Sequence, residues 1–252
     1  MTLTNVFTLN ALSGFAWPFT RDDSEPAHPL LAQSKEYFAA LDQTRPLNEY
    51  DFVVLDTELT GLNVKKDEIV TIGALRLSEM RIDMEKSFYF CACPTRAVPK
   101  QSIVIHGITP SEAQKAPPLR EALQGLLNFC GNAVIVGHNI NLDMSVINRE
   151  LKKEFGGELH NPCIDTMRLA RVYREGQWTG AYECYEEYSY NLRKLSREFG
   201  LPLFTEHNAF TDALQTAYLF IYLVHKMQEN ATWTLKDLCR AGCIRRGFFQ
   251  SR

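Results

Sequence analysis

The ten residues VVLDTELTGL (53–62) constrain the fold more than any other stretch, because they place two acids directly behind an apolar run. The consecutive apolar residues Val53, Val54 and Leu55 are typical of a strand that is buried on both faces. Asp56 and Glu58 follow, separated by one residue. Carboxylates next to a core lose hydration and repel each other unless something compensates their charge. The stretch therefore predicts a central strand with a charged partner opposite its two acids.

Length and composition narrow the class of protein. The 252 residues fit one large domain with extensions, and a hydrophobic content of 45% is enough to fill a sizeable core. The formal net charge of -3 argues against non-specific coating of nucleic acid, which needs a basic face, but it permits an enzyme that binds a few phosphates. The seven cysteines are scattered and lack zinc-finger spacing, so we expect reduced core thiols.

The chain carries no evident targeting or membrane segment. Its N-terminus lacks a basic stretch followed by an unbroken apolar run, so we expect no signal peptide. The longest apolar run, AYLFIYLV (217–224), is much shorter than the roughly 20 residues that a membrane span needs. We therefore expect a soluble, cytoplasmic protein with no membrane partner.

The pattern after residue 50 predicts an α/β fold. We expect strands at 52–56, 69–77 and 86–93, and a polar turn at 63–68. No crossover helix fits between these strands, so they predict a three-stranded antiparallel meander. Before the meander, residues 30–42 are predicted as a helix. After it, we expect a strand at 133–139 and helices at 117–131, 142–155, from Asp165 or Thr166 onward, 191–199 and 211–227. The result is a mixed sheet with helices packed against it.

Acids recur where strands end and helices begin. Asp56 and Glu58 follow the first strand, Asp143 lies in the first turn of the helix at 142–155, and Asp212 opens the helix at 211–227. His207 lies five residues before Asp212. Taken singly, Asp143 and Asp212 are also explained as acids that stabilise a helix start, and His207 as an incidental loop histidine.

Taken together, the four carboxylates favour a metal site. Four acids that converge repel one another unless cations fill the space between them, and an all-oxygen ligand set suits Mg²⁺ or Mn²⁺. Two such ions about 3.5–4 Å apart stabilise the attacking and leaving oxygens in phosphoryl displacement. That reaction also needs a base for the water, and histidine titrates near neutral pH. The hypothesis for what lies opposite the acids is therefore two metal ions.

At this point the sequence resembles a known family. The segments DTELTGL (56–62), GHNINLD (137–143) and HNAFTD (207–212) are similar to the three motifs of the DEDDh 3′→5′ exonucleases, relatives of the proofreading epsilon subunit of bacterial DNA polymerase III. The resemblance covers roughly residues 48–228. It implies a ribonuclease H-like fold and three parts: an N-terminal extension at 1–47 that is partly helical, an exonuclease domain at 48–228 and a C-terminal extension at 229–252.

The resemblance also implies roles for individual residues. Asp56, Glu58 and Asp212 would hold the metal that activates water, Asp56 and Asp143 would hold the second, and His207 would be the general base. Thr57, Leu62 and His106 would contact the terminal nucleotide, with Leu62 wedged against the last base, and Asn139 would position backbone or phosphate.

Several of these roles have structural alternatives. Leu62 also fits a packed loop residue, His106 a turn histidine and Asn139 a turn-closing asparagine. Leu142 and Leu59 replace a phenylalanine and a threonine that are frequent in the family, yet both substitutions keep the acids. The aromatic insert at 175–190 is predicted to pack as an extra helix rather than stack on bases, and the basic, aromatic tail at 240–249 to cap the chain.

The function that follows is a metal-dependent 3′→5′ exonuclease that releases 5′-mononucleotides from DNA. Its expected partners are a single-stranded or frayed 3′ end, with DNA favoured over RNA, and a DNA polymerase or repair protein. Two alternatives stay open. One is an exoribonuclease or oligonucleotide-degrading enzyme of the same family, because discrimination rests on contacts to the 2′-hydroxyl. The other is a non-catalytic binding module with the same fold, although all five motif residues are present.

Overall fold

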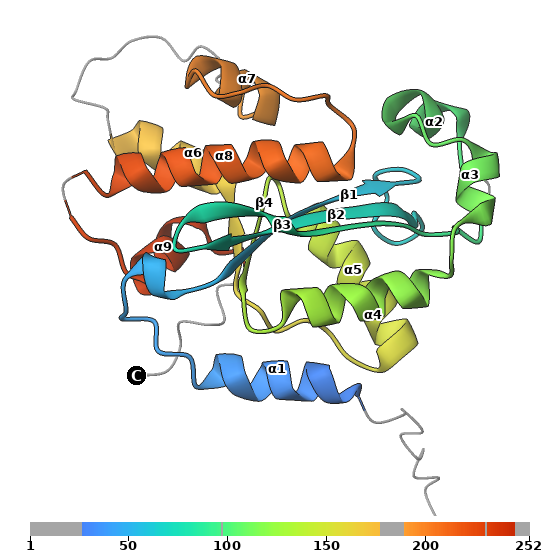
Figure 1. Cartoon of the computed structure of the whole chain (residues 1–252), viewed down its shortest axis with the longest axis horizontal. Helices are drawn as coiled ribbons and strands as arrows, with labels where there is room; N and C mark the ends of the chain where they lie inside the picture. The colour runs from blue at the N-terminus through green and yellow to red at the C-terminus, as the bar shows by residue number, and fades with distance from the viewer. Residues whose placement is uncertain (1–26, 97, 177–188, 230, 245–252) are drawn as a thin grey trace, which may run out of the picture.

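A computed structural model describes residues 27–96, 98–176, 189–229 and 231–244. A five-stranded mixed sheet lies at its centre, with helices on both faces (Figure 1). The strands are β1 (Phe52–Leu59), β2 (Ile69–Ser78), β3 (Arg81–Cys91), β4 (Val134–Gly137) and β5 (Cys163–Asp165), in the order β3-β2-β1-β4-β5. β1, β2 and β3 pair antiparallel, whereas β4 and β5 run parallel to β1. The predicted α/β class and antiparallel meander are therefore confirmed.

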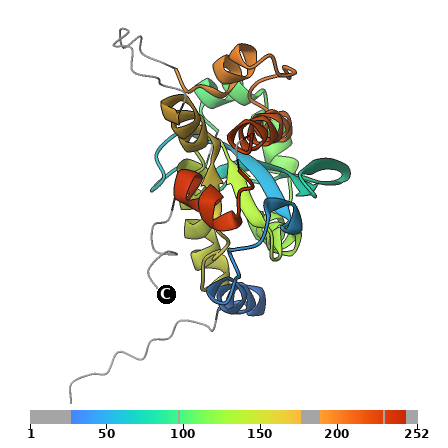
Figure 2. The ribbon, with the colours of Figure 1, turned by 90° about the vertical axis from the view of Figure 1, so that its left-hand side faces the viewer.

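Alternation along β1 divides the core into two layers. Val53 and Leu55 belong to the core beneath α4 (Leu119–Cys130) and α5 (Asn141–Phe155). Phe52 and Val54 belong to the core on the other face, which α8 (Ala209–Met227) covers. Since side chains of a strand point alternately to its two faces, this central strand is buried on both sides, as its unbroken apolar run predicts. Figure 2, turned by 90°, shows the sheet between the two helical layers.

The remaining helices complete these layers. They are α1 (Pro29–Ala39), α2 (Lys100–His106), α3 (Pro110–Lys115), α6 (Thr166–Gly176), α7 (Leu192–Glu198) and α9 (Leu235–Gly242), with a short 3-10 helix at Leu47–Glu49. Leu31 of α1 joins the core of α4 and α5, and Leu238 of α9 joins the core of α8. Helices from both predicted extensions therefore pack on the same two cores as the segment between them. The domain boundaries placed after residues 47 and 228 remain predictions.

The third strand begins five residues earlier than predicted. β2 and β3 are joined by only Glu79 and Met80, which have φ of 51° and 60°. Two consecutive positive φ values form the mirror-image turn whose twist matches a hairpin, and this turn usually contains asparagine or glycine. The Glu-Met pair lacks that signature, so the tight turn was not predicted and the start of the strand was placed too late.

Other boundaries also moved. α2, α3 and β5 were not predicted. The helix predicted at 211–227 begins two residues earlier, because the side chain of Asn208 caps it by accepting hydrogen bonds from the N–H groups of Phe210 and Thr211. The helix predicted at 30–42 is shorter, Pro29–Ala39, and the one predicted at 117–131 begins after its two prolines. Most of the insert at 175–190 and of the tail at 240–249 lies outside the described residues.

Two compositional predictions can be compared with the described part of the chain. Its six cysteines are free thiols, and Cys130, Cys163, Cys239 and Cys243 are buried. Reduced core thiols are thus confirmed for these four positions. Among the described helices, none combines the length and the apolar character that crossing a bilayer requires.

Candidate active site

Three carboxylates meet where β1 passes the start of α8. Asp56 and Glu58 share the face of β1 that α8 covers, and Asp212 lies in the first turn of that helix. One oxygen from each of Asp56, Glu58 and Asp212 lies within 4.8 Å of the other two. Both β1 acids stand inside the strand rather than at its end as predicted, because β2 continues to pair with β1 up to Leu59. β4 stops pairing at Val54, which leaves Asp56 beyond the end of that neighbouring strand.

The fourth acid reaches β1 from the opposite layer. Asp143, in the first turn of α5, accepts hydrogen bonds at its Oδ1 from the backbone N–H and the hydroxyl of Thr57, at 3.0 Å and 2.5 Å. Thr57 points to the α5 face because it alternates with Asp56 along the strand. The structure therefore ties Asp143 to Thr57 and brings it close enough for its charge to act on Asp56.

A glycine allows α8 to come this close to the sheet. Gly73 of β2 is paired with Asp56, and a Cβ added to Gly73 would lie 2.3 Å from both the carbonyl carbon of Ala209 and the backbone nitrogen of Phe210. Backbone atoms cannot turn away as a side chain can. The missing side chain at Gly73 therefore sets the distance between Asp212 and Asp56.

Replacing Gly73 with alanine is expected to damage the site. The added methyl group must push the first turn of α8 off the sheet, which we expect to cost about 1–3 kcal/mol of unfolding free energy. A displacement of about 1 Å at a catalytic group is enough to lower turnover roughly 100-fold. Melting curves and a nuclease assay would measure both effects. Gly125→Ala is the matched control, because the added Cβ would meet only the movable ring of Phe88; equal behaviour of the two variants would contradict this role for Gly73.

Burial and mutual repulsion raise the pKa values of these acids. Burial, followed by the charges of Asp212 and Asp143, raises the pKa of Glu58 to about 7. The pKa of Asp56 is raised well above its usual range by burial and then by Asp143, Asp212 and Glu58. Burial also raises the pKa of Asp143 and of Asp212, although hydrogen bonds from Thr57 and from the Asn208 backbone oppose it.

These carboxylates fit a divalent cation. They supply only oxygen ligands, and ionising all of them in a buried site is unfavourable without a positive charge between them. Asp212 also serves the helix start, since its Oδ2 accepts a hydrogen bond from the N–H of Asn208 at 3.1 Å. The helix-start interpretation and the metal-ligand interpretation of Asp212 are therefore compatible, because one oxygen is committed to the backbone and the other is available.

His207 shares a cleft with two of the acids. This cavity of about 170 Å³ is lined by Asp56, His138, Asn191, Leu192, Arg193, Phe204, Glu206, His207, Asp212 and Gln215. His207 is exposed and has a φ of 62°, a left-handed conformation that is uncommon for residues other than glycine. Its imidazole charge and its backbone N–H both act to lower the pKa of Asp212, so the ring and the carboxylate are close.

The predicted nucleotide contacts lie outside that cleft lining. Leu62 is 82% exposed, so the alternative of a packed loop residue is wrong. His106 accepts a hydrogen bond at Nδ1 from the N–H of Ile108, as a turn histidine does, while its buried Nε2 has no partner among the described residues. Burial, and then the charge of His207, lower the pKa of His106. Asn139 has a φ of 55° and its N–H donates to Asp165, which agrees with a turn-closing role.

The loop that presents Leu62 is held from α5. Arg149 of α5 donates hydrogen bonds to the carbonyl oxygens of Val64 and, at 2.6 Å, of Asp67. This link was not predicted from the sequence. His138 was not predicted either; its ring is hydrogen-bonded to Thr166 Oγ1 at 2.9 Å and to the carbonyl oxygen of Tyr190 at 2.8 Å. Such hydrogen bonds join residues that are far apart in the chain, so no local sequence pattern predicts them.

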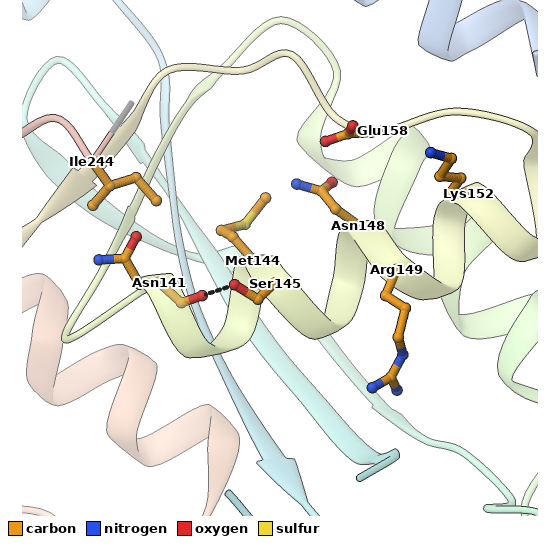
Figure 3. A pocket seen from close by; sticks show the side chains of 8 residues that line it. All are labelled: Asn141, Met144, Ser145, Asn148, Arg149, Lys152, Glu158 and Ile244. Carbon is orange, nitrogen blue, oxygen red and sulfur yellow. Dashed lines mark hydrogen bonds between the residues drawn. The ribbon is translucent and has the colours of Figure 1, made fainter. Parts of the chain in front are cut away.

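A larger cavity lies on the outer flank of α5 but has different chemistry. It measures about 380 Å³ and is lined by Asn141, Met144, Ser145, Asn148, Arg149, Lys152, Glu158 and Ile244 (Figure 3). None of the four predicted metal ligands and no histidine reaches it. Converging acids and a histidine mark the smaller cleft as the candidate active site.

Comparisons with known proteins identify relatives of this chain. The sequence profile of the RNase_T family, described as "Exonuclease", matches residues 53–220. A DNA polymerase III PolC-type protein of Thermotoga maritima is 32% identical over 83% of this chain, and this chain spans only 14% of that relative's length. The DNA polymerase III subunit epsilon of Aquifex aeolicus is 31% identical over 70% of this chain and 81% of its own.

Solved structures resemble the fold. Exonuclease X, solved in complex with 5′-overhanging duplex DNA, superposes with a TM-score of 0.57 at 22% identity, covering 75% of this chain and 98% of its own. Exonuclease I of E. coli, in a complex with single-stranded DNA, gives a TM-score of 0.61 at 20% identity, covering 75% of this chain and 42% of its own. The predicted ribonuclease H-like fold is thereby confirmed. Because the profile match covers more than half of the chain, the chain belongs to the RNase_T family of exonucleases.

Proposed function

We propose that the chain is a divalent-metal-dependent 3′→5′ exonuclease that hydrolyses the terminal phosphodiester bond of DNA and releases 5′-mononucleotides. The observation that carries the proposal is the meeting of Asp56, Glu58 and Asp212 within 4.8 Å, beside a histidine in the same cleft. A DNA substrate and a polymerase partner are supported by relatives that are named as DNA polymerase III proteins and by neighbours solved with DNA.

Each of the site residues has its own proposed role in hydrolysis. Asp56, Glu58 and Asp212 would hold one Mg²⁺ or Mn²⁺, and Asp56 with Asp143 a second. Bound ions would supply the positive charge that offsets the acids and the developing charge on the phosphate. His207 takes a proton from the attacking water as the water oxygen bonds to phosphorus. The bond from phosphorus to the 3′-oxygen breaks, and that oxygen is protonated as the shortened strand leaves.

Two features suit a 3′ end. Leu62 stands exposed on the loop after β1, where an apolar side chain can press against an unpaired terminal base. His106, whose Nε2 has no hydrogen-bond partner within the described ranges, follows two exposed apolar residues of α2, Val104 and Ile105. Ser102 of α2 donates a hydrogen bond to the carbonyl oxygen of Thr60 at 2.7 Å, which fixes this helix to the Leu62 loop. We propose that Thr57, Leu62 and His106 contact the terminal nucleotide and that Asn139 lies on the strand's path.

The test is degradation of a 5′-labelled single-stranded oligonucleotide in Mg²⁺ or Mn²⁺. We expect a ladder that shortens from the 3′ end, 5′-mononucleotides as the product, and full inhibition by EDTA. A phosphorothioate linkage at the 3′ terminus should block the reaction, and an RNA of the same sequence would reveal a preference for ribose. Efficient cutting of a closed circle would contradict an exonuclease, and an inactive protein that still binds the strand would favour the binding module.

A further inference from the structure

An arginine side chain lines the cleft that holds His207. Of the described residues that line it, Arg193 is the only lysine or arginine, and it faces a set that includes Asp56, Asp212 and Glu206. A nucleic-acid strand that enters this cleft brings further negative charge. Metal ions can offset part of that charge, but Arg193 is the arginine that the described lining of the cleft contributes.

Arg193 is only partly committed to its protein partners. Its Nη1 lies 3.3 Å from Oε2 of Glu206 and 3.4 Å from the carbonyl oxygen of Phe204. Its Nε and Nη2 make no hydrogen bond to any residue in the described part of the chain. The side chains of Arg193 and Glu206 are 32% and 43% exposed, so Glu206 remains hydrated if Arg193 changes partner.

The loop before α8 does not need Arg193 to hold it. Gln215 is buried and accepts a hydrogen bond from the N–H of Phe204 at 3.2 Å, and it donates to the carbonyl oxygen of Pro202 at 2.8 Å. Thr211 donates to the carbonyl oxygen of Thr205 at 2.6 Å. These bonds hold the segment from 202 to 205 without Arg193, so the contacts of Arg193 to Phe204 and Glu206 are not the only ones that anchor it.

We propose that Arg193 binds the phosphate of the substrate's terminal nucleotide, the group under attack, by exchanging Glu206 for phosphate oxygens. This inference rests on the proposed exonuclease function. The planar guanidinium can donate two parallel hydrogen bonds to a phosphate, and both of its uncommitted nitrogens are available for them. Because the released 5′-mononucleotide keeps that phosphate, Arg193 also binds the product.

The experiment compares Arg193→Gln, Glu206→Gln and the control Lys194→Gln. Lys194 is exposed on the same helix, does not line the cleft, and its loss removes the same charge. On a single-stranded oligonucleotide with Mn²⁺, Arg193→Gln should lower kcat/KM about 10- to 100-fold, the usual loss for a hydrogen bond to a charged group. It should also reduce the slope of log affinity against log salt by about 0.7, as expected for one lost phosphate contact on a single strand. Glu206→Gln should leave KM unchanged or lower it, and Lys194→Gln should match wild type.

Product binding separates this inference from the proposed function. In Mn²⁺, thymidine 5′-monophosphate should bind the wild type more tightly than thymidine does, and Arg193→Gln should lose about 10- to 100-fold of that preference without a change in melting temperature. The measurement needs no turnover, so an inactive wild type would refute the exonuclease proposal while Arg193 is still tested. Identical behaviour of Arg193→Gln and Lys194→Gln would overturn the inference. So would parallel losses of kcat and melting temperature in Arg193→Gln and Glu206→Gln, which would show a loop tether.

Discussion

Replacing Asp212 with asparagine is expected to abolish nearly all nuclease activity and most of the stabilisation by Mn²⁺, while the metal-free protein stays as stable as wild type or becomes more stable. Asp212 is the acid that α8 adds to Asp56 and Glu58 on β1. Asparagine keeps its shape but removes one negative charge. With a cation present, the site loses one ligand. Without a cation, the repulsion among the carboxylates is reduced, because only Asp56 and Glu58 of the three remain able to carry a charge.

The pH dependence of metal-free stability gives the sign of this effect. The pKa of Glu58 rises from its usual 4.5 to about 7 in the folded chain, so the folded state keeps a proton that the unfolded state loses. The stability that this proton contributes is fully present below pH 4.5 and is lost as pH rises through about 7. Asp212→Asn should therefore stabilise the metal-free protein more at about pH 8 than at about pH 5, where repulsion is already relieved.

Melting curves with and without Mn²⁺ decide whether Asp212 is a ligand. Wild type should gain about 2.7 kcal/mol when the free ion is at a hundredfold excess over its dissociation constant, and Asp212→Asn should gain far less. Asp237→Asn is the matched control, because Asp237 is a first-turn acid of α9 whose side chain accepts a hydrogen bond from the backbone N–H of Thr234, the N-cap residue. That control should keep its activity and its full response to Mn²⁺. An equal response in Asp212→Asn, or an active variant, would mean that Asp212 is not a ligand.

The parts of the fold that sequence predicted are those encoded locally. The apolar run at Val53 to Leu55 requires burial on both faces, and Gly156 and Gly200 end helices in left-handed conformations that favour glycine. The three-residue strand β5 carries no such signal, because it exists only through its pairing with β4 and one bridge to Cys243. α2 likewise lacks a side-chain cap and is fixed by the bond from Ser102 to the Leu62 loop.

The same distinction holds for the site. Acids at the start of helices and behind an apolar strand can be read from the chain, so Asp56, Glu58, Asp143 and Asp212 were candidates from the beginning. Gly73 was not, because its role depends on the backbone of α8, more than a hundred residues away. Arg193 was missed for a similar reason, since a lone arginine on a short helix gives no sign of the cleft it faces. Residue types that supply chemistry are visible in sequence, whereas residues that set distances are visible only in the fold.

Replacing His207 is expected to lower turnover roughly 10²- to 10⁴-fold, the usual contribution of a general base, while the response to Mn²⁺ stays intact. The imidazole shares the cleft with Asp56 and Asp212 but is not one of the three residues whose oxygens converge. The three converging carboxylates therefore stay in place when the imidazole is removed.

Backbone conformation decides which His207 variant is informative. At a φ of 62°, alanine adopts the left-handed region less readily than histidine or asparagine does, so a slow His207→Ala could reflect a displaced loop. Asparagine adopts the left-handed region readily, so His207→Asn keeps the loop while removing the base. Both variants should therefore be slow, with His207→Asn melting at the wild-type temperature. His225→Ala, an exposed histidine in the last turn of α8, should behave as wild type. Full activity of His207→Asn near neutral pH would exclude His207 as the base, and another group in the cleft would have to accept the proton.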